Sequence, residues 1–167
     1  MREYFTEALV LDKQNKGEFD SRVFLYTKEL GRISAKVTSA RKIISKLNPH
    51  LEPLNIVDVR LVHKNNFQVI DVLRKEKLPL NFLQIIRAVQ ELTLENEPDF
   101  SLWTILQVLH QKKYPNLGMV LNILGYSHEF ASCVVCEQDP THFSFKELSF
   151  YCKNCASQNQ QHFLLIL

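Results

Sequence analysis

The chain has 167 residues, of which 46% are hydrophobic and 23% are charged, and its formal net charge is +2. This composition is that of an ordinary globular protein, and it excludes a mainly disordered, collagen-like or low-complexity chain. The longest uninterrupted apolar run covers the five residues 163–167, whereas a membrane-spanning helix needs roughly 20. Because Glu3 also stands where a secretory signal would be basic, we expect a cytoplasmic protein without a membrane span.

The first 75 residues have the composition and spacing of β-strands. We expect short strands over residues 4–11, 23–27, 32–37, 54–62 and 67–73, which are rich in β-branched and aromatic residues. Turns at 28–31 and 63–66 would close two hairpins. Five short strands, with a longer connection between the third and the fourth, predict a small closed barrel of the OB-fold type. An SH3-like barrel is the alternative.

Positive charge is concentrated in this part of the chain. Residues 1–75 hold 14 Lys and Arg against nine Asp and Glu, whereas residues 76–167 hold six against nine. The stretch 32–46 contains five cations and no acid. Segregated charge indicates a partner of opposite charge, and we therefore expect this region to bind nucleic-acid phosphates. The candidate contacts are Lys16, Arg22, Arg32, Lys36, Arg41, Lys42 and Lys46.

Three residues of the second predicted strand share one face. Arg22, Phe24 and Tyr26 are spaced by two, so their side chains point to the same side of the sheet. Such a face can stack nucleic-acid bases, or it can belong to the core, as most aromatic side chains do. The sequence leaves both interpretations open.

After residue 79 the apolar spacing changes to that of helices. Apolar residues at 82, 83, 85, 86, 89 and 92 follow the i, i+3, i+4, i+7 rule, which predicts an amphipathic helix that Asn81 can cap. A second helix is expected over 102–109, with cations near its end. Asn116 begins a short third helix that Gly125 ends.

Four cysteines give the clearest local pattern. They follow the spacing C-x2-C-x15-C-x2-C, which is typical of a four-thiolate zinc site. Two disulfides or a redox pair are the alternatives, but structural disulfides are rare in the cytoplasm, and neither pair lies beside a βαβ unit. We therefore expect one structural Zn²⁺ held by Cys133, Cys136, Cys152 and Cys155. Glu137 stands where glycine usually follows the first pair.

No catalytic motif is present. The sequence lacks the phosphate-loop, dinucleotide-binding and nucleophile-elbow patterns, and His128-Glu129 lacks the second histidine of a zinc protease. We expect a protein that is not an enzyme. One alternative to nucleic-acid binding is a protein-interaction adaptor, in which the barrel and the zinc module bind other proteins and the basic segment only favours solubility.

Several short motifs occur in a characteristic order. Residues 8–11, 17–20, 23–27 and 30–32 form the first group, residues 39–42 with 51–54 form the second, and residues 121–126 lead into the first cysteine pair. In this order the chain resembles the RecO family of bacterial DNA repair and recombination-mediator proteins. The resemblance covers nearly the whole chain.

The resemblance implies a fold, an activity and partners. With the patterns above, it predicts an α+β protein: an OB-fold barrel over 1–76, a helical domain over 77–131 and 157–167, and a four-cysteine zinc module over 132–156. It implies binding of single- and double-stranded DNA, annealing of complementary strands, and loading of recombinase onto DNA coated by single-strand-binding protein. The implied partners are RecR and the C-terminal peptide of single-strand-binding protein, and the implied location is the nucleoid.

Overall fold

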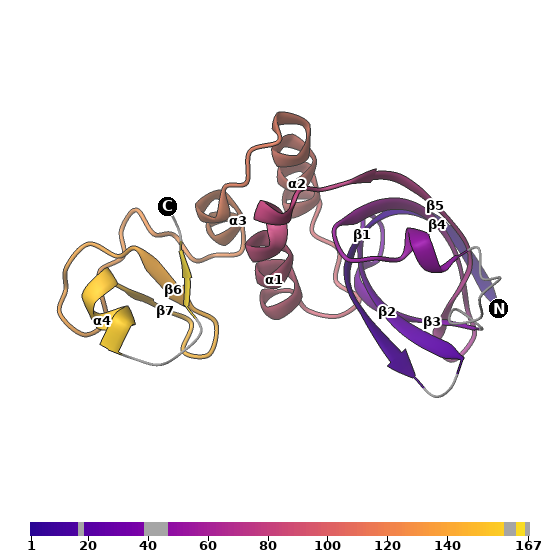
Figure 1. The fold of residues 1–167 in the computed structure, drawn as a ribbon, viewed down its shortest axis with the longest axis horizontal. Helices are drawn as coiled ribbons and strands as arrows, with labels where there is room; N and C mark the ends of the chain where they lie inside the picture. Colours follow the sequence, from indigo (N-terminus) through magenta and orange to yellow (C-terminus); the bar gives the residue numbers. More distant parts are fainter. Residues whose placement is uncertain (17–18, 39–46, 159–162, 166–167) are drawn as a thin grey trace. The chain divides into compact units, whose positions relative to one another are not determined.

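The structure of the protein is a computed structural model that describes residues 1–16, 19–38, 47–158 and 163–165 (Figure 1). The chain divides into two compact units, Met1–Phe100 and Ser101–Leu167. The first unit holds five β-strands and a helix, and the second holds three helices and a small sheet. The chain is thus a mixed α+β protein with an N-terminal five-stranded sheet, as expected from the sequence.

The five strands of the first unit form one continuous antiparallel ladder that is closed by a short parallel pairing. They are β1 (Arg2–Lys16), β2 (Asp20–Thr27), β3 (Gly31–Val37), β4 (Asn55–His63) and β5 (Phe67–Lys77). Strand β1 pairs with both β2 and β4, and β3 pairs with β5 in parallel, which gives a closed barrel in the order β1-β2-β3-β5-β4. A short 3-10 helix, η1 (Asn48–His50), precedes β4.

The barrel interior is filled by alternate residues of all five strands. On β3, for example, Ile33, Ala35 and Val37 are buried, as the sequence pattern predicts. On β5 the buried residues are Val69 and Val72, three apart, because the register of β4 and β5 shifts between Arg60 and Leu61. Such an irregularity bends the strand and helps a small sheet to close.

The hairpin between β2 and β3 depends on a glycine. Gly31 has a φ of +67°, and a Cβ built on it would lie 2.2 Å from the carbonyl oxygen of Glu97. Only glycine adopts this conformation without strain while the backbone of residues 97–98 passes so closely. The turn is closed by the backbone N–H of Leu30, which donates to Thr27 Oγ1 at 2.9 Å.

A helix follows the barrel within the same unit. It consists of a 3-10 turn, η2 (Leu80–Phe82), and α1 (Leu83–Leu92), whose buried side chains are Ile85, Ile86, Ala88 and Val89. The expected cap at Asn81 is wrong, because the chain enters the 3-10 turn at Pro79 and no side chain caps either segment. The prediction missed this turn because a 3-10 turn and an α-helix share nearly the same apolar spacing.

The second unit contains the remaining helices and a three-stranded sheet. Its elements are α2 (Phe100–Lys112, starting on the last residue of the first unit), α3 (Leu117–Ile123), β6 (His142–Ser144), β7 (Ser149–Tyr151), α4 (Lys153–Gln158) and β8 (Phe163–Leu165). The Asn116 side chain caps α3 by accepting from the N–H of Met119 at 2.9 Å, and Gly125 follows the helix with a φ of +90°. Both features were predicted. Strand β6 lies between β7 and β8.

Helix α1, which the sequence analysis groups with the other helices, belongs to the first unit. The three-part domain division expected from the sequence stays a prediction. Among the described residues, no helix is both long and apolar enough to cross a membrane.

Candidate metal centre and nucleic-acid interface

The four cysteines converge on one point in the second unit. Their Sγ atoms all lie within 4.8 Å of one another. The Cys136 Sγ is 3.6 Å from the Sγ of both Cys152 and Cys155, far longer than the roughly 2.05 Å of a disulfide bond. Cys133 is buried and Cys136 is exposed. The cluster can therefore hold a metal ion at the protein surface, with all four positions filled by protein ligands.

Backbone hydrogen bonds shape the first cysteine pair into a tight knuckle. The N–H of Cys133 donates to the carbonyl of Gln138 and the N–H of Glu137 donates to the carbonyl of Cys133, both at 2.9 Å. Glu137 adopts a φ of +59°, a left-handed conformation that glycine takes more easily. This explains why glycine is usual at this position and shows that the chain makes the same turn without it.

The second cysteine pair leads into α4. Cys152 immediately precedes the helix, and its carbonyl accepts from the N–H of Ala156 at 3.0 Å. The N–H of Cys155 points to the Sγ of Cys152 at 3.5 Å. The residue before α4 and the first turn of α4 thus direct the sulfurs of Cys152 and Cys155 toward those of the first cysteine pair. The N–H of Val134 donates to the carbonyl of Phe150 at 3.0 Å and fixes the knuckle on β7.

The arrangement of the cysteines shifts the pKa values of their thiols in opposite directions. Burial alone would raise the pKa of Cys133, but hydrogen bonds from the backbone N–H groups of Cys152, Val135 and Cys136 lower it to about 6. Hydrogen bonding with Cys136 and Cys152, together with burial, raises the pKa of Cys155 to about 12. Four thiolates cannot share so small a volume without a cation, because their charges repel one another.

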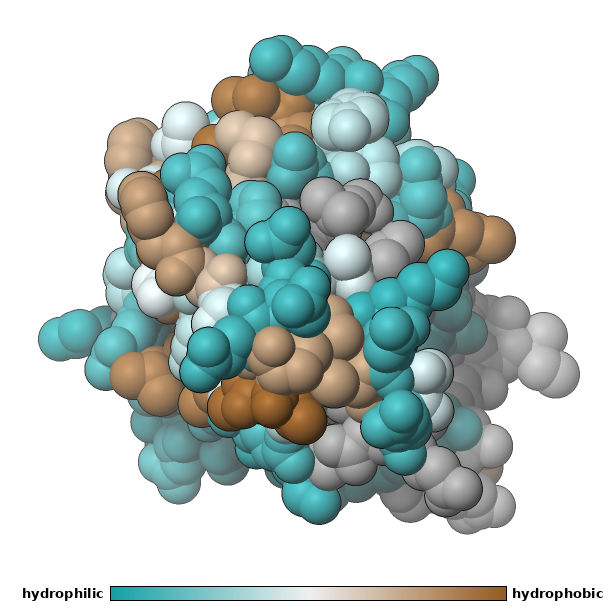
Figure 2. All heavy atoms as spheres, turned by 90° about the vertical axis from the view of Figure 1, so that its left-hand side faces the viewer, coloured by the Kyte–Doolittle hydropathy of each residue, from teal (hydrophilic) through white to brown (hydrophobic). Residues whose placement is uncertain are grey.

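An aromatic cluster supports the metal centre. The Phe143 side chain on β6 is fully buried, and its ring lies edge-on to Tyr126, Phe145 and Phe150 at centroid distances of 5.2, 5.7 and 5.1 Å. Figure 2, viewed from the side of Figure 1 on which the second unit is drawn, shows hydrophobic residues exposed among hydrophilic ones. The exposed hydrophobic side chains of the cysteine-rich region include Val134, Val135 and Leu148.

Three of the predicted nucleic-acid contacts meet on the barrel. Lys16, Arg22 and Lys36 line a cavity of about 170 Å³, together with Asp20, Ser21, Ser34, Asn66 and Phe67. We call this cavity the basic pocket. The strand register places Arg22 directly opposite Lys36 and Lys16 opposite Asp20. The Lys36 Nζ lies 2.8 Å from the Asp20 carboxylate and is half exposed.

Ser21 and Phe67 also line the basic pocket. The Ser21 Oγ is buried and has no hydrogen-bond partner among the described residues. Phe67 stacks on His63 at a centroid distance of 4.4 Å and meets the Tyr4 ring edge-on at 5.9 Å. The sequence analysis missed Ser21, Asn66 and Phe67. Barrel closure could have indicated Phe67, because closure brings the start of β5 beside β3, where Ala35 pairs with Phe67.

Arg32 has a different environment. Its Nε donates to the carbonyl of Thr93 at 3.0 Å, an Nη lies 3.9 Å from the Glu95 carboxylate, and its side chain is only 21% exposed. The Arg32 carbonyl also accepts from the N–H of Asn96 at 2.8 Å. Arg32 therefore holds the segment after α1 against β3. That it also contacts nucleic acid stays a prediction.

The remaining predicted residues divide in two ways. Arg41, Lys42 and Lys46 lie outside the described residues, so their contacts stay predictions. Tyr26 is fully buried, and its hydroxyl lies 3.3 Å from the N–H and 3.4 Å from the carbonyl of Asp99. Of the two interpretations of this strand face, the structure favours core packing for Tyr26.

Comparison with known proteins places the chain in a family. The family model described as "Recombination protein O N terminal" matches residues 1–75. A DNA repair protein RecO of Thermodesulfovibrio yellowstonii is 32% identical over 92% of this chain and 70% of that relative. DNA repair protein RecO of Alkaliphilus metalliredigens is 24% identical over 90% of this chain and 71% of the relative. Because the similarity extends along almost the whole chain, the protein belongs to the RecO family.

Proposed function

We propose that this protein is a non-catalytic DNA-binding recombination mediator that acts in DNA repair, as the names of its relatives indicate. It binds single- and double-stranded DNA through the five-stranded barrel, which has the strand order and closure of an OB-fold. The observation that carries the proposal is the basic pocket, which Lys16, Arg22 and Lys36 line together.

The basic pocket suits a phosphate of the nucleic-acid backbone. Arg22 and Lys36 are cross-strand neighbours, so one phosphate can be neutralised by two cations. The phosphate would compete with the Asp20 carboxylate for Lys36. Neutralising phosphates on two strands lowers their mutual repulsion and releases counterions, which is what annealing of complementary strands needs.

Arg32, Arg41, Lys42 and Lys46 are proposed to extend this contact along the strand. In the sequence, the basic stretch that contains the last three follows Lys36 directly. A backbone longer than one phosphate is proposed to meet these further cations as well. Each added contact contributes to affinity and increases its dependence on salt.

The cysteine cluster is proposed to hold one structural Zn²⁺. Four sulfurs at the usual zinc–sulfur distance of 2.3 Å from a common centre lie about 3.8 Å apart. The 3.6 Å separations of Cys136 from Cys152 and Cys155 are close to this value. With four protein ligands the ion has no open position for water, so its role is to stabilise the fold of the second unit.

The proposed partners follow from family membership. They are RecR and the C-terminal peptide of single-strand-binding protein, and the proposed reaction sequence ends with recombinase loaded onto DNA that single-strand-binding protein coats. The corresponding location is the cytoplasm, at the nucleoid.

An annealing assay tests the DNA proposal. The rate at which two labelled complementary oligonucleotides pair is measured with and without protein, at several salt concentrations. We expect acceleration that fades with salt, and we expect Arg22→Ala and Lys36→Ala each to weaken DNA binding roughly five- to tenfold, because each removes a charge-assisted contact. The slope of log affinity against log salt should fall by about 0.7 per lost contact with single strands.

Lys75→Ala is the matched control. Lys75 has a side-chain exposure of 47%, close to the 52% of Lys36, and it also pairs with a carboxylate, at 3.0 Å from Glu7. It does not line the basic pocket. Equal losses for Lys36→Ala and Lys75→Ala would show that only net charge matters, and unchanged affinity in both pocket variants would contradict the proposal and favour the adaptor alternative.

A further inference from the structure

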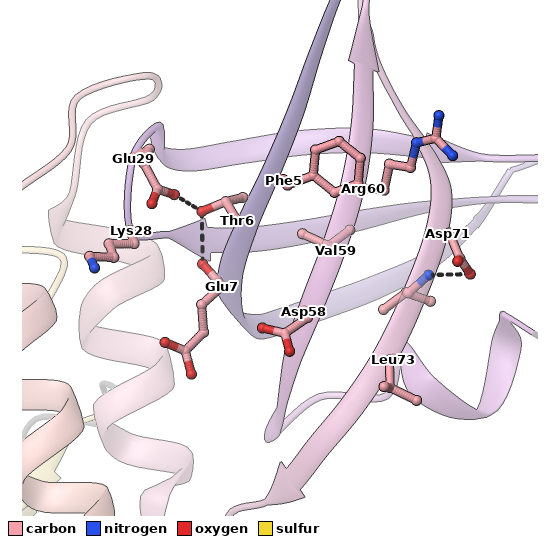
Figure 3. A pocket seen from close by; sticks show the side chains of 11 residues that line it. Phe5, Thr6, Glu7, Lys28, Glu29, Asp58, Val59, Arg60, Asp71 and Leu73 are labelled. Carbon is pink, nitrogen blue, oxygen red and sulfur yellow. Dashed lines mark hydrogen bonds between the residues drawn. The ribbon is translucent and has the colours of Figure 1, made fainter.

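The barrel carries a second, larger cavity with a very different lining. It has a volume of about 470 Å³ and is formed by β1, β4, β5 and the turn between β2 and β3 (Figure 3). Four carboxylates line it, those of Glu7, Glu29, Asp58 and Asp71, but only two cations, Lys28 and Arg60. We call this cavity the acidic groove. Its lining shares no residue with that of the basic pocket.

Strand register arranges the outer side chains of the acidic groove in two rows. The first row, across β1, β4 and β5, is Phe5, Arg60 and Asp71, and the second is Glu7, Asp58 and Leu73. Thr6, Val59 and Val72 lie between the rows and are buried. The first row thus presents an aromatic ring, and the second presents two adjacent carboxylates. The two rows are separated by two residues, or about 6.8 Å, along the strand.

The apolar side chains of the acidic groove are left open to solvent. Phe5 is 72% exposed and Leu73 is 63% exposed. The guanidinium of Arg60 lies over the Phe5 ring at 5.3 Å and pairs with Glu3, which holds the ring in place from one side. An exposed ring with a fixed orientation loses little side-chain entropy when a partner covers it.

Carboxylates outnumber cations in the lining of the acidic groove. The Lys75 ammonium lies 3.0 Å from Glu7 and 3.7 Å from Asp58. The Glu29 carboxylate accepts from the hydroxyl of Thr6, a neutral donor. The acidic groove therefore attracts a cation and repels phosphates, which excludes the nucleic acid proposed for the basic pocket as its ligand.

We propose that the acidic groove docks an extended segment of a partner protein in which a lysine or arginine stands two residues from a large apolar residue. In an extended segment, side chains spaced by two point the same way and are separated by the same distance as the two rows. The apolar side chain packs on Phe5 in the first row, and the cation reaches Glu7 and Asp58 in the second. Shape and charge together select this chemistry over an acidic peptide.

A peptide-binding measurement on the full chain tests this. The probe is a short dye-labelled peptide of glycine and serine with a single leucine–x–lysine motif, and the control peptide has glutamate in place of the lysine. We expect fluorescence anisotropy to show binding of the first peptide and at least about tenfold weaker binding of the second. Absence of binding by the lysine peptide at millimolar concentration, or equal binding of both peptides, would overturn the proposal.

Variants locate the binding on the protein. Phe5→Ala and Asp58→Lys are each expected to weaken binding of the lysine peptide at least about tenfold, since one removes the apolar contact and the other reverses a charge. Both side chains are exposed, so the fold is kept. Phe130→Ala and Glu91→Lys are the matched controls, because they change an exposed phenylalanine and an exposed acid that are not among the lining residues of the acidic groove. Equal losses in controls and groove variants would contradict the assignment.

The two proposals fail separately. Phe5→Ala is expected to leave strand annealing unchanged, and Arg22→Ala is expected to leave peptide binding unchanged, because the two linings share no residue. Sedimentation of the wild type decides between a partner and a second copy. Self-association that Phe5→Ala and Asp58→Lys abolish would show that the acidic groove binds another copy of this chain, and would overturn the partner-protein proposal.

Discussion

At the scale of single residues, Gly31 is a position where the backbone requires glycine. It has a positive φ, and the Glu97 carbonyl occupies the space that a side chain would need. The segment that approaches it is also held by Arg32 through the carbonyl of Thr93. The β2–β3 hairpin thus contacts the segment that follows α1 closely at Gly31, where there is no room for a side chain.

We expect Gly31→Ala to lower the free energy of unfolding by about 2–4 kcal/mol, because it adds a left-handed alanine and a clash with backbone. Gly125→Ala is the control. Gly125 also has a positive φ, but nothing lies within 4 Å of its missing Cβ, so we expect only the conformational cost of about 1 kcal/mol. Urea denaturation of both variants measures the difference, and equal losses would show that the close approach to Glu97 carries no energetic weight.

The residue scale also shows what a sequence pattern can and cannot supply. The cysteine spacing predicted which four sulfurs converge, because two short turns are enough to place them. The charge pattern predicted Lys16, Arg22 and Lys36, which strand pairing brings together around one cavity. Ser21 and Asn66 could not be predicted, because a serine in a strand and an asparagine in a turn are common, and only the folded barrel places them beside these cations. The charge pattern also could not reveal that Arg32 holds the segment after α1, because this role depends on a long-range contact with Thr93.

At the scale of elements, all five strands were predicted, and their lengths were not. Strand β1 continues from the expected 4–11 to Lys16. Its pairing with β2 shifts register between Val10 and Asp12, so the strand changes direction there and extends beyond the apolar run. Alternation of apolar residues detects the buried part of a strand, whereas hydrogen bonding to neighbours decides where the strand ends. The short 3-10 turn before α1 was missed for a related reason, since spacing does not reveal which hydrogen bonds form.

Strand β2 anchors the segment before α2 through Tyr26. Burial raises the pKa of its hydroxyl to about 12, against 10 for an unperturbed tyrosine. The folded state therefore holds this proton more tightly than the unfolded state. The stabilisation is fully present below pH 10 and is lost as the pH rises through 12.

We expect Tyr26→Phe to be less stable than the wild type at pH 8, because two long hydrogen bonds to the Asp99 backbone are removed. The difference should shrink between pH 10 and 12, where only the wild type must bury or expel a phenolate. Thermal melts across this pH range measure it. Tyr114→Phe, at an exposed position, provides the control for alkaline effects elsewhere, and a stability difference that stays constant with pH would contradict the assignment.

At the scale of the whole molecule, the barrel unit carries two cavities with linings of opposite charge. The barrel unit carries the basic pocket and the acidic groove with no lining residue in common, and both depend on the closed strand order for their geometry. A sequence count of charges gives the excess of cations in this half, but it averages over the two surfaces. Only the pairing of β1 with β4, and of β4 with β5, gathers Glu7 and Asp58 at one place.

The cysteine-rich end of the second unit depends on a different source of stability from the barrel. Its sheet has three strands of three residues each, and the buried cluster beside it consists of Cys133, Tyr151, Cys152 and Ala156. So small an apolar core is insufficient without a cross-link or a metal ion. The four thiols at its centre repel one another once ionised, so removal of the proposed ion would leave the cysteine-rich region without its main constraint.

A strong chelator is therefore expected to unfold residues 132–156 and to leave β1–β5 folded, because the barrel has its own core. Hydrogen exchange followed by mass spectrometry measures this on the full chain, peptide by peptide. Protection of the barrel peptides should stay unchanged, whereas peptides that contain β6, β7 and α4 should exchange at the rate of an unfolded chain. Adding Zn²⁺ back should restore their protection in the wild type, and not in Cys136→Ser, which lacks one ligand. Full protection of the cysteine-rich peptides in chelator would mean that packing around Phe143 suffices to hold the cluster together, and that the ion is not required for the fold.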